Sequence, residues 1–140
     1  MAPIRAKIRL DFCGEEGRQS LLWGRTKPET AAESSRQRQA MALKSLPWQG
    51  VTLEEIETGQ EVYTIPSVER GEKIAYAPVE LTVKADSLED LVPFILREEF
   101  RKIKILDPDE MVFSSLDIER TIFKMGREFR IEVNREGYLH

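Results

Sequence analysis

A chain of 140 residues has the length of one domain, and its 41% apolar and 33% charged residues allow a core beneath a heavily charged surface. No apolar stretch reaches the length of a membrane span or of a secretory signal, so we expect neither membrane insertion nor secretion. A single cysteine, Cys13, excludes an internal disulfide and a cysteine zinc cluster, and it suits a reducing, cytoplasmic setting.

The formal net charge of −4 is unevenly distributed along the chain. Residues 1–50 contain nine Lys and Arg against five Asp and Glu, whereas residues 51–140 contain twelve against twenty. The basic N-terminal third can therefore contact nucleic acid or an acidic protein, while the acidic remainder repels phosphate. An ordinary solvated surface explains the same pattern. The single asparagine and the high charge content lean toward a thermophilic source.

Strict alternation over residues 4–12 predicts a strand with one buried face. Charged residues take the positions of the other face, and Gly14 begins the break after the strand. The apolar residues of the buried face are Ile4, Ala6, Ile8, Leu10 and Phe12.

Residues 24–50 form the segment with the fewest core-forming residues. Pro28 predicts the start of a helix that runs to about residue 46, because proline is tolerated in a first helical turn. The apolar residues gather late in this segment, so its first half is either a solvated helix or a mobile loop. We expect residues 25–38 to be mobile when the protein is alone.

Residues 51–60 are ambiguous, and we predict a short helical turn there. Thr52 and Glu55 have the spacing of a capping box, and Gly59 supplies a stop signal. Residues 61–68 and 72–85 then predict two strands, because apolar and polar residues alternate on either side of a turn at Gly71.

A helix is predicted after residue 85, where Asp86 and Ser87 supply a cap. Pro93 is expected to kink this helix or to delay its start. A short strand over residues 103–106 and a turn at Pro108 follow. The apolar stripe of the helix comprises Leu88, Leu91, Val92, Ile95 and Leu96.

The last helix is predicted over residues 116–133, and residues 134–140 are expected to fray. Gly126 would let a neighbouring element approach its apolar stripe closely. A hairpin that turns at Gly126 is the rival interpretation, because the residues after it also alternate with charges. The stripe comprises Ile118, Ile122, Met125, Phe129 and Val133.

These elements predict a single α+β domain over residues 1–140. It has an antiparallel sheet with two principal helices, one after the strand at residues 72–85 and one at the C-terminus. The polar segment at about residues 25–46 adds a further helix or a mobile loop. A ferredoxin-like arrangement is one option, since these patterns do not determine the strand order.

Residues suited to catalysis are few. His140 is the only histidine and the last residue, so a pair with Cys13 would need a docked tail. Glu99 lies in line with the apolar stripe of the helix predicted after residue 85, where partial burial would raise the pKa of its carboxyl group. The simpler interpretation is that Glu99 reaches water, because it lies at the end of that helix. We expect no metal and no cofactor, and we lean against an enzyme. A cluster of three carboxylates could offer oxygen ligands to a hard cation, but it lacks the spacing of a calcium-binding loop. Its members are Asp107, Asp109 and Glu110.

The leading hypothesis is a non-enzymatic regulatory or adaptor protein that binds another protein. Aromatic residues beside polar segments are typical contact anchors. Trp48 has two alternative roles, as a plug that closes the core or as an anchor buried only in a complex, and the plug is slightly favoured. The candidate partner-binding residues are Trp23, Trp48, Phe123, Arg120, Lys124 and Arg127.

The alternative hypothesis is a nucleic-acid-associated factor that uses the basic N-terminal third. A small carboxylate-dependent enzyme, built around Glu99 or the three carboxylates after residue 106, is the third. The candidate nucleic-acid-binding residues are Arg5, Lys7, Arg9, Arg25, Lys27, Arg36 and Arg38.

Overall fold

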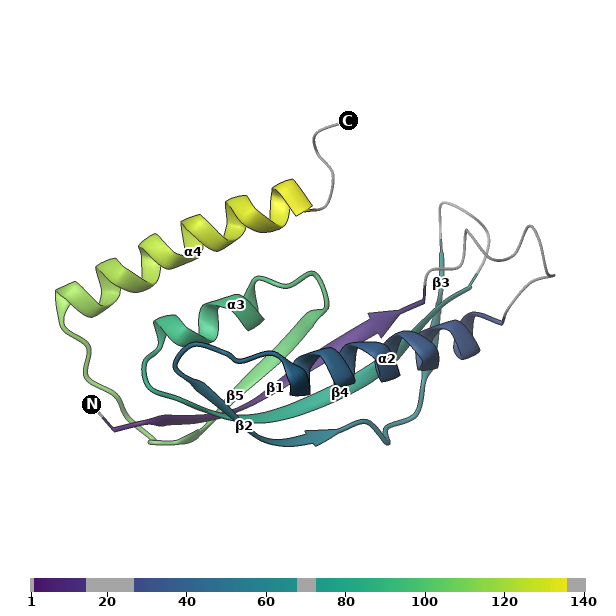
Figure 1. Ribbon diagram of the computed structural model, residues 1–140, viewed down its shortest axis with the longest axis horizontal. Helices are drawn as coiled ribbons and strands as arrows, with labels where there is room; N and C mark the ends of the chain where they lie inside the picture. Colours follow the sequence, from purple (N-terminus) through teal and green to yellow (C-terminus); the bar gives the residue numbers. More distant parts are fainter. Residues whose placement is uncertain (1, 15–26, 68–72, 136–140) are drawn as a thin grey trace. The chain divides into compact units, whose positions relative to one another are not determined.

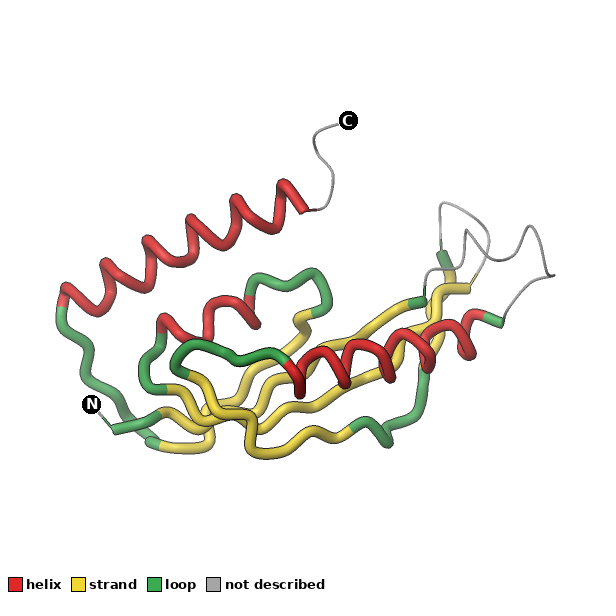
Figure 2. The backbone as a smooth tube through the Cα atoms, in the orientation of Figure 1, coloured by secondary structure: helices red, strands yellow, loops and turns green. Residues whose placement is uncertain are grey.

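The computed structural model describes residues 2–14, 27–67 and 73–135 (Figures 1 and 2). Two candidate residues, Trp23 and Arg25, lie outside the described residues, as do positions 136–140 of the expected tail. The elements are, in chain order, β1 (Ile4–Cys13), α2 (Pro28–Ser45), β2 (Val51–Glu57), β3 (Tyr63–Pro66), β4 (Lys73–Ala85), the 3₁₀ helix η1 (Glu89–Leu91), α3 (Val92–Ile95), β5 (Phe100–Asp107) and α4 (Ser115–Arg135).

The strands form one antiparallel sheet of five strands, which together with the helices confirms the predicted α+β class. Its strand order is β2-β4-β1-β5, so that β2 and β5 lie at its edges, and β3 also pairs with β4. Tyr63 of β3 lies opposite Tyr76 of β4. The ferredoxin-like option stays a prediction: the chain order β-α-β-β-α-β agrees with it, whereas β3 and α4 lie outside that pattern.

The contacts within the chain divide it into two compact units. Strands β1, β2 and β4 contribute residues to both units, whereas α3, β5 and α4 belong to unit 1 and α2 and β3 belong to unit 2. Unit 1 comprises Met1–Ile8, Trp48–Glu55 and Thr82–His140, and unit 2 comprises Arg9–Pro47 and Ile56–Leu81.

The alternating strand predicted at the N-terminus is confirmed. β1 buries Ile4, Ala6 and Ile8 in unit 1, and Leu10 and Phe12 in unit 2, while the charged residues between Ile4 and Ile8 are exposed. The exception is Asp11, which the alternation places on the charged face and the structure buries. β4 supplies the facing apolar residues, so both units build their cores on these two strands. The buried residues of β4 include Ala75, Ala77, Val79, Leu81, Val83 and Ala85.

Of the two alternatives for the polar segment, the structure shows the helix. α2 begins at Pro28 and packs with small residues, since Ala32 forms a buried cluster with Ala75 and Ala77 of β4. Gly14 lies so close to Ala31 that any side chain at position 14 would overlap it. Small contact residues therefore let a polar helix pack closely on the strands of unit 2.

The short helical turn predicted at residues 51–60 is wrong, because residues 51–57 form strand β2. Val51 and Leu53 are half-buried and alternate with exposed residues. The Asp86 amide, directly after β4, donates to the Gly50 carbonyl at 2.8 Å. The pairing of β2 with β4 thus overrides the capping-box spacing, which by itself favours the start of a helix.

The helix predicted after residue 85 is present but short. η1 precedes a single turn of α-helix, and Pro93 lies in the first turn of α3, so the expected delay of the helix start is confirmed. Leu91, Val92 and Phe94 are buried, whereas Ile95 is only half-buried. The predicted stripe therefore omitted Phe94, the largest fully buried side chain of this segment.

The C-terminal segment is one continuous helix, α4, so the helix is confirmed and the rival hairpin is wrong. The close approach expected at Gly126 is also wrong. A Cβ atom there would meet only the tip of the Arg130 side chain, at 3.6 Å. β5 is confirmed as a strand and is longer than the predicted residues 103–106.

Candidate partner-binding surface

α4 begins with a reciprocal cap built from its own sequence. The Ser114 amide donates to the Asp117 carboxylate, and the Asp117 amide donates to the Ser114 hydroxyl, both at 3.1 Å. The hydrogen bond from the Ser114 amide lowers the pKa of Asp117 below its ordinary value. These bonds satisfy amide groups that the first helical turn leaves unpaired.

The apolar stripe of α4 lies exposed, contrary to the usual burial of such a stripe. We name Ile118, Ile122, Met125 and Phe129 the apolar row; they follow one another at positions i, i+4, i+7 and i+11. Their exposed fractions are 41%, 62%, 42% and 60%. Because isolated exposed apolar residues are common but aligned ones are not, this row is the clearest candidate contact surface of unit 1.

The polar side of α4 faces the rest of unit 1 instead. α4 contacts η1 and α3, and the side chains of Lys124 and Glu128 are only 20% and 18% exposed. Their charged groups are 3.8 Å apart. The helix is therefore attached to unit 1 through a polar surface, and its apolar row remains available for contact.

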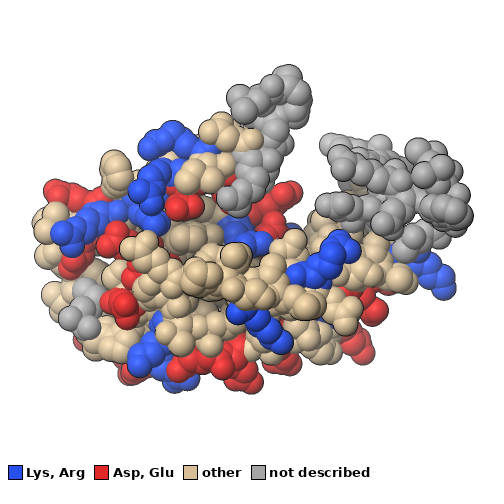
Figure 3. All heavy atoms as spheres, viewed as in Figure 1, with Lys and Arg blue, Asp and Glu red and all other residues tan. Residues whose placement is uncertain are grey.

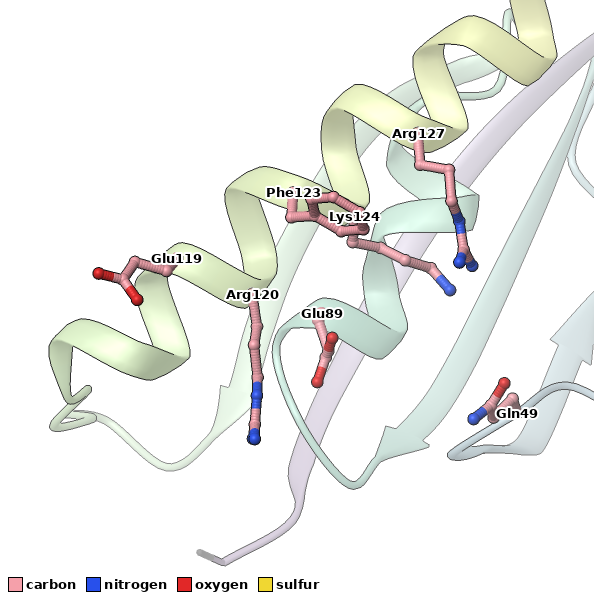
Figure 4. A pocket seen from close by; sticks show the side chains of 7 residues that line it. All are labelled: Gln49, Glu89, Glu119, Arg120, Phe123, Lys124 and Arg127. Atoms are coloured by element: carbon pink, nitrogen blue, oxygen red, sulfur yellow. The ribbon is translucent and has the colours of Figure 1, made fainter.

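A pocket of about 530 Å³ lies between α4, η1 and the turn before β2 (Figure 4). Arg120, Lys124 and Arg127, which we name the basic row, all extend from α4 toward the side on which Glu89 and Gln49 lie. The structure thus brings together four of the six predicted partner-binding residues. The lining residues are Gln49, Glu89, Glu119, Arg120, Phe123, Lys124 and Arg127.

Trp48 lies in the turn before β2, and its ring packs against a buried residue. The ring centroids of Trp48 and Phe94 are 4.5 Å apart, with their planes inclined by 38°. Gly50 has a φ of +70°, and any side chain there would overlap the Asp90 carboxylate. The turn thus requires glycine and directs Trp48 onto Phe94, which is the geometry expected of a plug.

Several of the predicted nucleic-acid-binding residues contact protein groups. The Arg5 guanidinium donates to the Glu54 carboxylate at 2.9 Å. Arg36 Nη1 donates to the carbonyls of Gln60 at 2.6 Å and Pro78 at 3.3 Å, and so supports backbone groups of unit 2. The remaining described residues of this set, whose side chains are exposed, are Lys7, Lys27 and Arg38.

Arg9 belongs to a cluster of polar side chains that the sequence pattern did not predict. It donates to both oxygens of Asp11, at 2.9 and 3.2 Å, and Tyr63 also donates to Asp11. The Asp11 carboxylate, chiefly through its hydrogen bond, raises the pKa of Arg9. Tyr63 stacks on Tyr76 at 5.5 Å. An Asp next to Phe12 in an apolar strand was the only sequence signal for this cluster.

The candidate carboxylates are not gathered into a site. Glu99 accepts hydrogen bonds from Arg97 at 2.9–3.0 Å. Among the described residues, no group of three or more His, Cys, Asp or Glu side chains is placed to hold a metal ion. That statement covers the three carboxylates after residue 106, namely Asp107, Asp109 and Glu110.

In the part of the chain that the structure describes, no helix combines the length and apolar character that crossing a bilayer requires. Comparison of the chain with protein-family models, with curated proteins and with solved structures finds no match.

Proposed function

We propose that this chain is a regulatory or adaptor protein that binds another protein through α4. The observation that carries this proposal is the exposed apolar row, whose spacing is that of a helix laid into a groove. The occupant is a partner protein with an apolar groove that receives Ile118, Ile122, Met125 and Phe129.

A groove suits this surface better than a second flat helix face does. Four aligned side chains cover little area, whereas a stable interface buries about 800 Å² on each partner. A groove surrounds the row on both sides and so adds contact area.

The test replaces Ile122 and Phe129 by serine in one chain. Proteins from the source organism captured on the wild type are identified, purified and titrated against each variant. The double variant should bind such a partner about thirtyfold more weakly or worse, because buried anchors often contribute about 2 kcal/mol or more. The matched control is Ile131→Ser, an exposed residue of the same helix outside the apolar row.

The control should bind like the wild type, with the same helix content by circular dichroism. Equal binding by the double variant and the control would show that α4 is not the interface. If the wild type self-associates in sedimentation and the double variant is monomeric, the occupant is a second copy, and the adaptor proposal is wrong.

A further inference from the structure

We propose that the pocket lined by the basic row binds an acidic peptide segment, through side-chain carboxylates that a partner protein supplies. This inference rests on the proposed function, because it assigns a chemical class to the partner. It concerns a second surface of α4, since the basic row and the apolar row lie on opposite sides of the helix at 3.6 residues per turn.

The basic row has guanidinium groups available for a ligand. Arg120 and Arg127 are exposed, and neither forms a hydrogen bond or a close ion pair with another residue that the structure describes, although Arg120 is near enough to Asp117 to interact with it electrostatically. Lys124, between them in sequence, is 3.8 Å from Glu128. Arginine presents paired N–H donors that match the two oxygens of a carboxylate, so both arginines can bind acidic side chains in this geometry.

The other walls of the pocket suit a polypeptide. Phe123 is 68% exposed and offers an apolar surface beside the cations. Gln49, on the facing turn, supplies an amide that can both donate to and accept from a peptide backbone. The volume of about 530 Å³ lies within the range of ligand clefts and holds a few side chains rather than a folded element.

Two carboxylates in the lining favour a short acidic peptide over a phosphate polymer. Glu89 extends into the space beneath α4, whereas Glu119 points away from it (Figure 4). Together they offset much of the charge of the basic row. Residues 51–140, which contain the pocket lining apart from Gln49, hold twenty Asp and Glu against twelve Lys and Arg. Nucleic acid would meet repulsion over a longer surface than a peptide with a few acidic side chains.

The experiment titrates the full chain with a short synthetic peptide of Glu and Gly, followed by nuclear magnetic resonance. The matched probe is the same peptide with Gln in place of Glu. Inorganic phosphate and a single-stranded oligonucleotide are the other two probes. Shifts are expected at Gln49, Arg120, Phe123 and Arg127 with the Glu peptide, and binding should weaken as salt is added.

The decisive variant is Arg120→Gln with Arg127→Gln, which should weaken binding of the Glu peptide about fivefold to tenfold. The control is Arg130→Gln, a change of charge on the same helix outside the pocket lining, which should alter binding about twofold or less. Unchanged spectra elsewhere in the chain verify that each variant is folded.

Three results would overturn the inference: equal binding of the Glu peptide by the double variant and the control, equal binding of the Gln peptide, or tighter binding of phosphate or oligonucleotide. If it fails while Ile122→Ser with Phe129→Ser still abolishes partner capture, only the pocket assignment is wrong. If both fail, the proposed function is wrong as well.

Discussion

Trp48 contributes to the core of unit 1 through its contact with Phe94, whose own side chain is only 2% exposed. Replacement of Trp48 by alanine should lower the free energy of unfolding by about 2–4 kcal/mol, because a half-buried ring is lost and Phe94 becomes exposed. Thermal and urea unfolding followed by circular dichroism measure this change.

Trp48→Phe is the matched control and should retain most of the stability, since a smaller ring can still cover Phe94. A Trp48→Ala variant with the melting temperature of the wild type would contradict the structural role. That result would make Trp48 a candidate partner-binding residue again.

The structural roles of single residues differ in how well the sequence predicts them. Gly50 could be predicted as a turn residue, since it follows Pro47 and Trp48 closely, and the structure gives it a positive φ. Asp11 could be predicted only in part, because Arg9 lies two residues away in the same strand, whereas Tyr63 comes from β3. No local pattern records which distant side chain satisfies a buried carboxylate.

At the scale of an element, the cap of α4 predicts a dependence of stability on pH. The Ser114 amide lowers the pKa of Asp117 below its ordinary value of 3.8. The ionised cap therefore stabilises the folded chain at pH values above 3.8. This contribution is lost as the pH falls through the lower pKa of the folded state.

Asp117→Asn tests this dependence, because asparagine can cap a helix but does not titrate. The difference in unfolding free energy between wild type and variant should be constant near neutral pH and should change as the pH falls below about 4. Urea unfolding at a series of pH values measures it. A difference that stays constant down to pH values well below 3.8 would show that the cap does not stabilise α4.

Strand β1 supplies the third prediction. Ile8 is fully buried, so Ile8→Ala should cost about 2–4 kcal/mol through the cavity it leaves. Lys7 is its exposed neighbour, and Lys7→Ala should cost less than about 0.5 kcal/mol. Equal losses in denaturant unfolding would contradict the one-sided burial of the strand.

Long periodic segments were predicted more reliably than short ones, although the short strand β5 was also predicted. The alternation of β1 and the helical spacing of α4 extend over enough residues to identify each element. β2 spans seven residues, and Thr52 with Glu55 has a helical signal that pairing with β4 overrides. α3 is a single turn that has Pro93 in its first turn and ends before β5.

At the scale of the whole molecule, the candidate surface was only partly predictable. The spacing of Arg120, Lys124 and Arg127 predicted one row on one helix face, and the structure places all three in one pocket lining. The sequence did not indicate that the opposite, apolar row is exposed. Periodicity identifies a face of a helix, but tertiary contacts decide which face is covered.

The charge asymmetry of the sequence is reduced by tertiary contacts. Arg5, from the basic N-terminal third, pairs with Glu54 from the acidic remainder, whereas Arg9 pairs with Asp11 within its own strand. On the face drawn in Figure 3, Lys and Arg are interspersed with Asp and Glu. The basic N-terminal third is therefore partly neutralised by ion pairs.

The edges of the described sheet bear charges of opposite sign. β5 exposes Arg101, Lys102 and Lys104, whereas β2 exposes Glu54, Glu55 and Glu57. An open strand edge is a template for pairing with another molecule, and the formation of fibrils begins with such pairing. Stacking like edges would bring charges of the same sign together and remove them from water. The exposed charges of β2 and β5 thus oppose the pairing of two β2 edges or of two β5 edges.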